Sequence, residues 1–200
     1  MLVKANEIPI GRSVFEAILA RRSVRTYAKN KVSHKAVNTL LEAAVRAPTA
    51  MQREPWAFVV VQDRQVLTKL SDLAKPIFLK EVHNRYSQGI KYSFEDYEQP
   101  DLDIFHGANT LIIICARSAG PFAVADCWLA AENLMLAACD MALGSCVIGC
   151  SISVLNARNV KTELGIPDEY VAVAPIIVGV PGEETAAKPR TPPLILAWKE

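Results

Sequence analysis

The stretch FAVADCWLAAENLMLAACDMAL, residues 122–143, decides the fold of this chain. Apolar residues cover nearly its whole circumference when it is drawn as a helix, which is typical of a helix buried in a core. Asp126, Asn133 and Asp140 recur every seven residues, or two turns, and therefore form one narrow polar stripe. Charged residues within the stretch argue against a membrane span. We predict a helix at the centre of the fold or at a subunit interface, closed by Gly144 as a left-handed C-cap.

The segments on either side alternate only partly between helix and strand patterns, and the chain has no Asn-Gly or Asp-Gly hairpin signal. Ser13 and Asp63 are placed to act as N-caps, and Gly165 follows the last helical pattern. Helices are predicted over 14–22, 33–47, 64–75 and 153–164, and strands over 56–63, 110–116, 145–150 and 169–181. This order predicts an α+β fold with one central sheet covered by helices.

We expect a single domain, residues 1–200, because the length suits one core and no repeat or linker divides the chain. Residues 76–107 have no clean period, and they predict either an inserted lid or an ordinary surface excursion. The tail, residues 183–200, has too many prolines for a sheet centre and is too apolar to be simply disordered. We therefore expect the tail to pack on another surface.

The formal net charge is only +1, so composition gives no general reason for binding nucleic acid or an anionic membrane. The N-terminal residues lack the long apolar core of a secretory signal, and we expect a cytoplasmic protein. The five cysteines are odd in number and form no CxxC pair, which argues against a disulfide framework or a zinc site. No metal site is predicted.

Familiar catalytic motifs are absent from the sequence. The stretch GSCVIGCS, residues 144–151, has the spacing of a phosphate-binding Walker loop, but Cys150 replaces the lysine that such a loop needs. No GxGxxG occurs, and the three histidines fit no nucleophile or metal pattern. A chain of this kind that performs chemistry usually relies on a bound cofactor.

The segment RRSVRTY, residues 21–27, places three arginines within five positions directly after an apolar run. One explanation is that basic residues stabilise the negative end of a helix dipole. The other is an anion site, which requires the chain to leave the helix before Arg25, so that paired guanidinium donors can bind a phosphate. Lys188 and Arg190, beside Pro189, could bind the same phosphate from the other end of the chain, although their spacing leaves this open.

Four segments together resemble the FMN-dependent nitroreductase superfamily: ILARRSVRTY, RAPTAMQREPWAFVVVQD, LAAENLMLAACDMALGSCVIG, and VGVPGE followed by KPR. They occur in the family's order and cover nearly the whole chain. The resemblance implies a nitroreductase-like α+β fold with a mainly antiparallel sheet. It also implies an intertwined homodimer with two FMN sites at the interface, and a tail over 183–200 that packs on the partner subunit.

The resemblance also implies which residues contact FMN. The RRSxR segment would contact the phosphate, the ribityl chain and the pyrimidine edge, and the basic pair of the tail would join it at the phosphate. The segment after the second helix would reach the partner's flavin, and backbone groups after the long helix would lie near flavin N5. The implied residues are Arg21, Arg22, Ser23, Arg25, Pro48, Thr49, Ala50, Gln52, Gly149, Cys150, Lys188 and Arg190.

The chain departs from the family pattern in one place. Where the family often reads PSSxNxQPW, this chain reads PTAMQREPW, so Gln52 replaces an asparagine and Glu54 a glutamine. Ala50 lacks the hydroxyl of the family's serine. An ionised Glu54 cannot donate a hydrogen bond, and we expect it to pair instead with Arg53 or with an arginine of the partner. These changes concern the substrate side of the site more than the fold.

The implied function is an oxidoreductase that takes hydride from NADH or NADPH onto FMN and passes the electrons to an electron-poor small molecule, such as a nitroaromatic or a quinone, by a ping-pong mechanism. Phe78, Tyr86, Tyr92 and Phe94 are candidates for shaping the acceptor pocket. Two alternatives remain open at this point. One is a dedicated flavoenzyme of the same superfamily, reductive or flavin-fragmenting, and the other is a flavin-binding module for sensing or storage.

Overall fold

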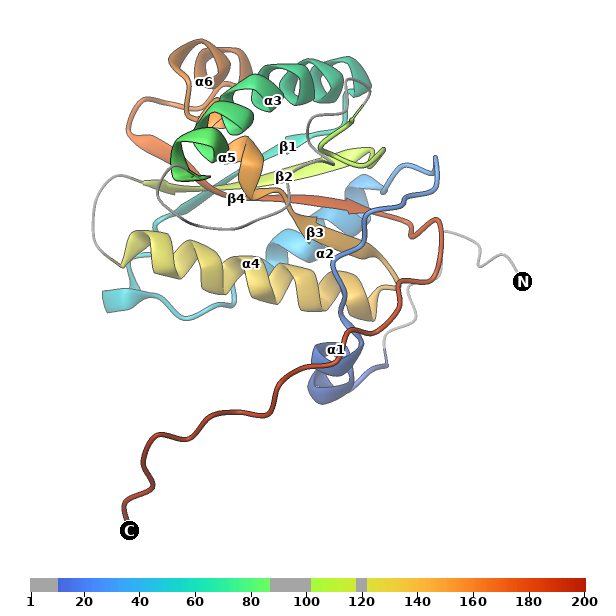
Figure 1. Cartoon of the computed structure of the whole chain (residues 1–200), viewed down its shortest axis with the longest axis vertical. Coiled ribbons are helices and arrows are strands. Elements are labelled where there is room, and N and C mark those ends of the chain that lie inside the picture. Colours follow the sequence, from blue (N-terminus) through green and yellow to red (C-terminus); the bar gives the residue numbers. More distant parts are fainter. Residues whose placement is uncertain (1–10, 87–101, 118–121) are drawn as a thin grey trace.

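The computed structural model describes residues 11–86, 102–117 and 122–200 (Figure 1). Its centre is a four-stranded sheet in the order β1-β2-β4-β3, in which every neighbouring pair is antiparallel. The strands are β1 (Trp56–Val61), β2 (Thr110–Arg117), β3 (Gly144–Val147) and β4 (Tyr170–Gly179). The two central strands are almost entirely buried, as expected for the apolar runs that form them. The predicted α+β fold with a mainly antiparallel sheet is confirmed.

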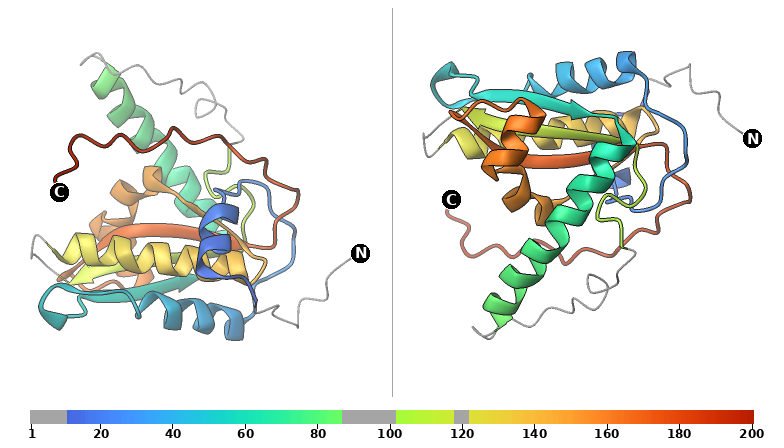
Figure 2. Two further views of the ribbon diagram at one scale, coloured as in Figure 1. Left: turned by 90° about the horizontal axis from the view of Figure 1, so that it is seen from below. Right: turned by 90° about the horizontal axis from the view of Figure 1, so that it is seen from above.

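Helices cover both faces of the sheet (Figure 2). On one face lie α2 (His34–Ala44) and α4 (Ala123–Asp140), which share one apolar core with the sheet. A second core lies on the other face, beneath α3 (Arg64–Tyr86), α5 (Ile152–Leu155) and α6 (Arg158–Leu164). The short α1 (Val14–Ala20) packs near the end of α4. Two single 3-10 turns, η1 (Ala50–Gln52) and η3 (Gly149–Ser151), complete the described elements.

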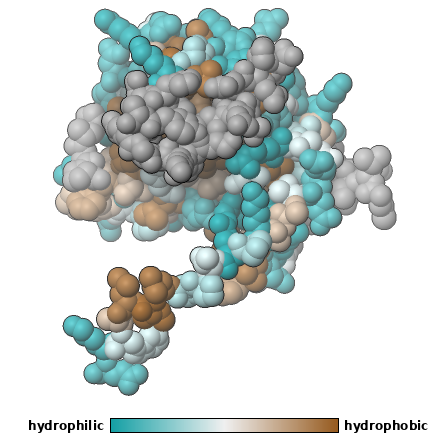
Figure 3. All heavy atoms as spheres, in the orientation of Figure 1, coloured by the Kyte–Doolittle hydropathy of each residue, from teal (hydrophilic) through white to brown (hydrophobic). Residues whose placement is uncertain are grey.

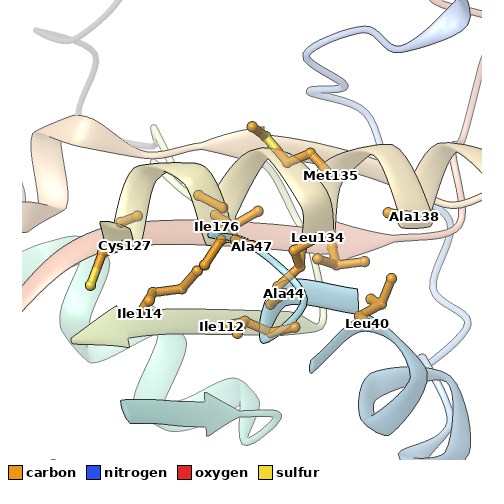
Figure 4. Packing of buried hydrophobic residues seen from close by; sticks show 14 of the residues in the cluster. Leu40, Ala44, Ala47, Ile112, Ile114, Cys127, Leu134, Met135, Ala138 and Ile176 are labelled. Atoms are coloured by element: carbon orange, nitrogen blue, oxygen red, sulfur yellow. The ribbon is translucent and has the colours of Figure 1, made fainter. Parts of the chain in front are cut away.

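Helix α4 buries one face in the core, as the prediction of a central helix requires, while Val124, Trp128 and Leu129 on its other face are exposed. Figure 4 shows its apolar side chains, among them Leu134 and Ala138, between α2 and the strands. The polar stripe connects α4 to three other segments. Asp126 accepts a hydrogen bond from the Ala50 amide, the Asn133 side chain donates to the Ala43 carbonyl, and Asp140 accepts from the Arg12 amide. The stripe therefore holds the chain before α1, the end of α2 and the loop after α2.

The predicted C-cap role of Gly144 is wrong. Ala142 takes the left-handed conformation after α4, with φ 54°, and Gly144 already begins β3. A Cβ atom at Gly144 would lie 2.8 Å from side-chain carbons of Val24, so the glycine serves close packing rather than a turn. Gly165, which follows the predicted helix, is the left-handed C-cap of α6, with φ 69°.

Two predicted helices have different bounds in the structure. The helix expected over 64–75 continues through Pro76 to Tyr86, so the predicted lid over 76–107 begins as the second half of α3. Residues 87–101, with Tyr92 and Phe94, lie outside the described residues, as does the side chain of Tyr86. The helix expected over 153–164 is divided into α5 and α6, and Asn156 lies at the break, where it bonds the backbone of Ala172 in both directions.

The tail beyond β4 runs away from the layered body without regular structure (Figures 1 and 2). Apolar residues gather at its end (Figure 3), and their side chains are exposed: Leu194, Ile195, Leu196 and Trp198. In the part of the chain that the structure describes, no helix is both long and apolar enough to cross a membrane.

Candidate functional site

The RRSVRTY segment leaves α1 at its first arginine. Arg21 has extended backbone angles, φ −56° and ψ 134°, directly after the last helical residue. The chain then lies beside β3, where the Val24 amide donates to the Ser145 carbonyl at 3.0 Å. Further on it pairs with the chain after β4, where the Ala28 amide donates to the Val180 carbonyl at 2.9 Å. The condition for an anion site is met, because the chain leaves the helix well before Arg25.

Side chains on the inner side of this segment fit against two glycines. Val24 is buried over Gly144, and Tyr27 packs on Gly179, where a Cβ atom would come within 2.7 Å of the ring. The Tyr27 hydroxyl donates to the Val24 carbonyl at 2.7 Å. These contacts fix the segment on the sheet. Residues that alternate with Val24, namely Ser23 and Arg25, are exposed on the outer side.

The three arginines of the segment have different surroundings. Arg21 forms an ion pair with Glu132 of α4, at 3.4 Å. The guanidinium of Arg22 donates to the Leu19 and Arg21 carbonyls at 2.6 and 2.8 Å, at the end of α1. Arg25 is exposed, and no acceptor among the described residues holds its guanidinium. Stabilisation of the helix end therefore accounts for Arg22, while Arg25 is available to a ligand.

The charge of Arg25 reaches two neighbouring groups. Burial lowers the pKa of the half-buried His106, and Arg25 lowers it further, against a smaller opposing effect of Asp103. Burial raises the pKa of Cys146 in β3, while Arg25, a hydrogen bond with Ser23, and Arg21 oppose that rise. These shifts favour the neutral forms of the His106 imidazole and the Cys146 thiol near Arg25.

A hollow of about 490 Å³ lies between the RRSVR segment, the end of α4 and the first part of the tail. Its lining includes Arg12, Arg21, Arg22, Ser145 and residues 183–187 of the tail. Thr26 links the segment to the tail by a hydrogen bond of 2.7 Å to Glu183. Lys188 and Arg190 follow directly; they are exposed and do not belong to this lining. The hollow is large enough for a small organic ligand.

Gly149 and Cys150 lie in η3, immediately after β3. Gly149 is exposed, and no described atom lies within 4 Å of where its Cβ would be. A flat ring could therefore approach the main chain closely at this point. Burial raises the pKa of the Cys150 thiol to about 11, so Cys150 is a packing residue rather than a thiolate.

The loop after α2 carries Pro48, Thr49, Ala50 and Gln52. Three residues of this loop, Met51, Gln52 and Glu54, have left-handed backbone angles without being glycine, at φ 53°, 53° and 44°. The loop is tied to α4 in its first turn, through Asp126, whereas Arg12 is tied to the last turn, through Asp140. These two carboxylates are 14 positions apart, or about 21 Å along the helix axis.

The structure thus brings the predicted site residues together in two groups. The RRSVR residues lie with β3 and the first part of the tail, while the loop residues lie at the opposite end of α4. The expected pairing of Glu54 with Arg53 is not found within the described residues. Sequence reasoning missed Glu132 and Asp126 as partners of the two groups, although the seven-residue spacing had marked Asp126.

The donors around Arg25 fit a cofactor that carries both a phosphate and a flat ring system. The exposed guanidinium of Arg25 and the hydroxyl of Ser23 suit phosphate and polar ring edges. The open main chain at Gly149 suits the ring face. In the described part of the chain, no group of three or more potential ligands could hold a metal ion.

Comparison with known proteins identifies the family of the chain. Residues 18–180 match the Nitroreductase family. A solved nitroreductase from Bacteroides fragilis with bound FMN is 29% identical and has a TM-score of 0.77, with 92% of this chain and 96% of that chain covered.

Two relatives carry names that describe an activity. A protein of Archaeoglobus fulgidus named "Putative NADH dehydrogenase/NAD(P)H nitroreductase" is 29% identical over 84% of each chain. An FMN reductase [NAD(P)H] of Bacillus subtilis is 25% identical over 90% of this chain and 70% of its own length. This chain belongs to the Nitroreductase family, since the family match spans most of its length.

Proposed function

We propose that this protein is an FMN-dependent oxidoreductase that passes electrons from NADH or NADPH to an electron-poor small molecule. The observation that carries the proposal is the exposed edge of Ser23 and Arg25 on β3, together with the open main chain of Gly149 after that strand, in a chain that belongs to the Nitroreductase family. FMN supplies reversible two-electron chemistry when bound. The acceptor is a nitroaromatic or a quinone, reduced in a second half-reaction after the nicotinamide has left.

The chain's own residues bind and orient the cofactor. Arg21 and Arg25 provide positive charge for the phosphate and for the pyrimidine edge, where that charge favours the reduced cofactor. Ser23 donates a hydroxyl hydrogen bond, and Gly149 and Cys150 present backbone groups to the reactive side of the ring. Arg22 contributes by fixing the end of α1, from which this edge begins.

A homodimer is part of the proposal, because one copy of the chain keeps the two groups of predicted contacts at opposite ends of α4. A flavin held by Arg25 of one protomer meets Pro48, Thr49, Ala50 and Gln52 only if a second protomer supplies them. The exposed apolar side chains on α1, Phe15 and Leu19, and on α4, Trp128, give the surface that such a dimer would bury.

The tail completes the dimer in this proposal. Lys188 and Arg190 join the phosphate, while the apolar end of the tail packs on the partner subunit. The five cysteines are unpaired, which supports a reducing compartment such as the cytoplasm.

Retention of FMN tests the proposed site. Arg21→Ala and Arg25→Ala each remove one charged donor, and each is expected to weaken FMN binding about 10-fold or more, with little loss of folding stability. Arg158→Ala, an exposed arginine on α6, removes the same charge far from the site and is the control. Fluorescence titration with FMN measures the affinity. Unchanged FMN affinity in both site variants would mean that neither arginine contacts FMN.

Anaerobic reduction decides between an enzyme and a binding module. The purified protein with FMN is expected to bleach on addition of NADH or NADPH and to regain its colour with a nitroaromatic or a quinone. A yellow protein that neither donor reduces would favour the sensing or storage module. Rapid reduction without turnover on any such acceptor would favour a dedicated flavoenzyme with another substrate.

A further inference from the structure

The carboxylate of Asp126 has an unusual environment in the first turn of α4. Its residue is only 5% exposed, and both carboxylate oxygens approach one backbone amide, that of Ala50, at 3.2 and 3.3 Å. Among the described residues, no lysine or arginine pairs with it. A buried carboxylate with a single neutral donor destabilises a fold relative to an apolar side chain of similar size. Its place in the first turn of α4 offsets part of this cost through the helix dipole, and the bond to Ala50 is the contact that this carboxylate adds to the fold.

The segment that Asp126 holds is strained. Met51 and Gln52 follow Ala50 directly, both with φ 53°, and Glu54 has φ 44°. Left-handed angles are unfavourable for such residues and persist only where the surroundings impose them. The bonds within the turn are long, at 3.4 Å from the Gln52 amide to Thr49 and 3.3 Å from the Arg53 amide to Ala50. The side chain of Met51 is 72% exposed, so packing does not impose the shape.

We propose that Asp126 is a positioning residue that holds the loop over 48–54 in this strained shape, so that the loop completes the flavin site of the partner subunit. The proposal rests on the proposed function for the presence of a flavin. The bond to Ala50 fixes the start of the turn, and the residues that point outward from it, Met51 and Gln52, are those that a partner's ligand would meet.

Asn133 and Asp140 show what a purely structural member of the same stripe does. Asn133 donates to the carbonyl of Ala43, at the end of the regular helix α2, and Asp140 accepts from the amide of Arg12, just before the N-cap of α1. Neither holds a run of left-handed residues. Asp126 differs from them because the loop that it bonds contains left-handed residues. The experiment must therefore distinguish a change in the shape of this loop from a general loss of stability.

Two substitutions test the hydrogen bond between the Ala50 amide and the Asp126 carboxylate, one at the acceptor and one at the donor. Asp126→Ala deletes the acceptor, and Ala50→Pro removes the donor by replacing the amide hydrogen with a ring carbon. Thr49 has φ −130° and ψ 147°, a conformation that tolerates a following proline, so Ala50→Pro leaves the course of the loop possible. Asp126→Asn keeps one oxygen that can accept from Ala50. Lys161→Met is the matched control, because it removes a buried charged group bonded to a backbone carbonyl, that of Asp168.

The readouts are FMN affinity, the visible circular dichroism of the bound flavin, and kcat and KM with NADH and 1,4-benzoquinone. Asp126→Ala and Ala50→Pro are expected to weaken FMN binding about 10-fold and to change the flavin dichroism alike, whereas Asp126→Asn stays within about 3-fold of the parent. Lys161→Met is expected to leave FMN affinity and the flavin spectrum unchanged, whichever way the melting temperature moves.

Parent-like FMN affinity and dichroism in Ala50→Pro would overturn the proposal, even if Asp126→Ala failed to fold. So would an Asp126→Ala variant whose flavin matches that of Lys161→Met. These outcomes are distinct from failure of the proposed function, which would be seen in the parent protein itself as absence of FMN binding or of reduction by NADH and NADPH.

Discussion

At the scale of single residues, substitutions at two glycines can distinguish effects on folding stability from effects on FMN binding. Gly149→Ala places a methyl group where no described atom lies within 4 Å, so the free energy of unfolding is expected to change by less than about 0.5 kcal/mol. FMN affinity is expected to fall about 10-fold, because the methyl group occupies the space needed by the ring. Urea unfolding and fluorescence titration measure the two effects.

Gly144→Ala is the contrasting variant. Its methyl group would lie 2.8 Å from carbons of Val24, so the RRSVR segment or β3 must shift, at a cost of about 1–3 kcal/mol in unfolding free energy. Equal FMN affinity in Gly149→Ala and the parent protein would contradict the placement of the ring over η3.

His106 makes folding stability depend on pH. Its folded pKa lies below the ordinary value of 6.5, mainly through burial and then through Arg25, so the unfolded chain binds the proton more readily. The contribution to stability is full above about pH 6.5 and is lost as the pH falls through the lower folded pKa. In His106→Asn, the unfolding free energy is expected to fall less between pH 7.5 and pH 5 than in the parent protein.

Asparagine is the suitable replacement because His106 has φ 53°, and asparagine tolerates left-handed angles. Urea unfolding at both pH values gives the comparison. Parallel loss of stability in the parent and the variant would mean that His106 titrates equally in the folded and unfolded chains, and that Arg25 does not act on it.

At the scale of elements, α1 should be the most easily weakened helix near the site. It has only seven residues, and its start is held by a capping box in which Ser13 accepts from the Glu16 amide while Glu16 accepts from the Ser13 amide. Ser13→Ala is expected to cost about 1 kcal/mol locally, since so short a helix has few other bonds. Hydrogen exchange at the Ala17 and Arg21 amides should then become about 5-fold faster.

Ser33→Ala is the matched control, because Ser33 caps α2 through the Ala36 amide at 3.2 Å. It should loosen α2 and leave exchange in α1 unchanged. If Ser13→Ala leaves the exchange of Arg21 unaltered, α1 is held by its contacts with α4 and not by its cap.

The elements also show what sequence patterns can and cannot predict. The polar stripe of α4 and the cap at Ser13 depend on neighbours within a few turns, and local patterns predicted them correctly. Gly144 was assigned to a helix end, although its role depends on Val24, which is 120 positions away. Pro76 lies inside α3, where propensity alone would end the helix.

In the candidate site, too, features set by local sequence were predicted and contacts between distant residues were not. The arginine cluster is visible in the sequence, but the predicted helix ran to residue 22, whereas the chain leaves the helix at Arg21. The ion pair of Arg21 with Glu132 and the hold of Asp126 on Ala50 join residues far apart in the chain, and no spacing rule predicts them. The separation of the RRSVR residues from the loop over 48–54 depends on the length of α4 between them, which no local pattern predicts.

At the scale of the whole molecule, the two groups of predicted flavin contacts and the exposed tail have one common explanation, a second copy of the chain. Leu196 is 90% exposed, and Trp198 is 76% exposed. Side chains of this kind at the end of an unstructured tail contribute nothing to the fold of a single copy. In a dimer they would be buried, each stabilising the interface by about 1.5–3 kcal/mol.

Leu196→Asp tests this explanation, because the fold of one copy should not respond to a charge at so exposed a position. The parent protein is expected to sediment as a dimer at micromolar concentration, and the variant is expected to dissociate at concentrations at least about 10-fold higher. FMN affinity should fall together with dimerisation, since each site would need both protomers. Glu200→Lys alters charge in the same tail beyond the apolar residues and serves as the control. A monomeric parent that binds FMN tightly would place the whole site within one copy and would separate the tail from it.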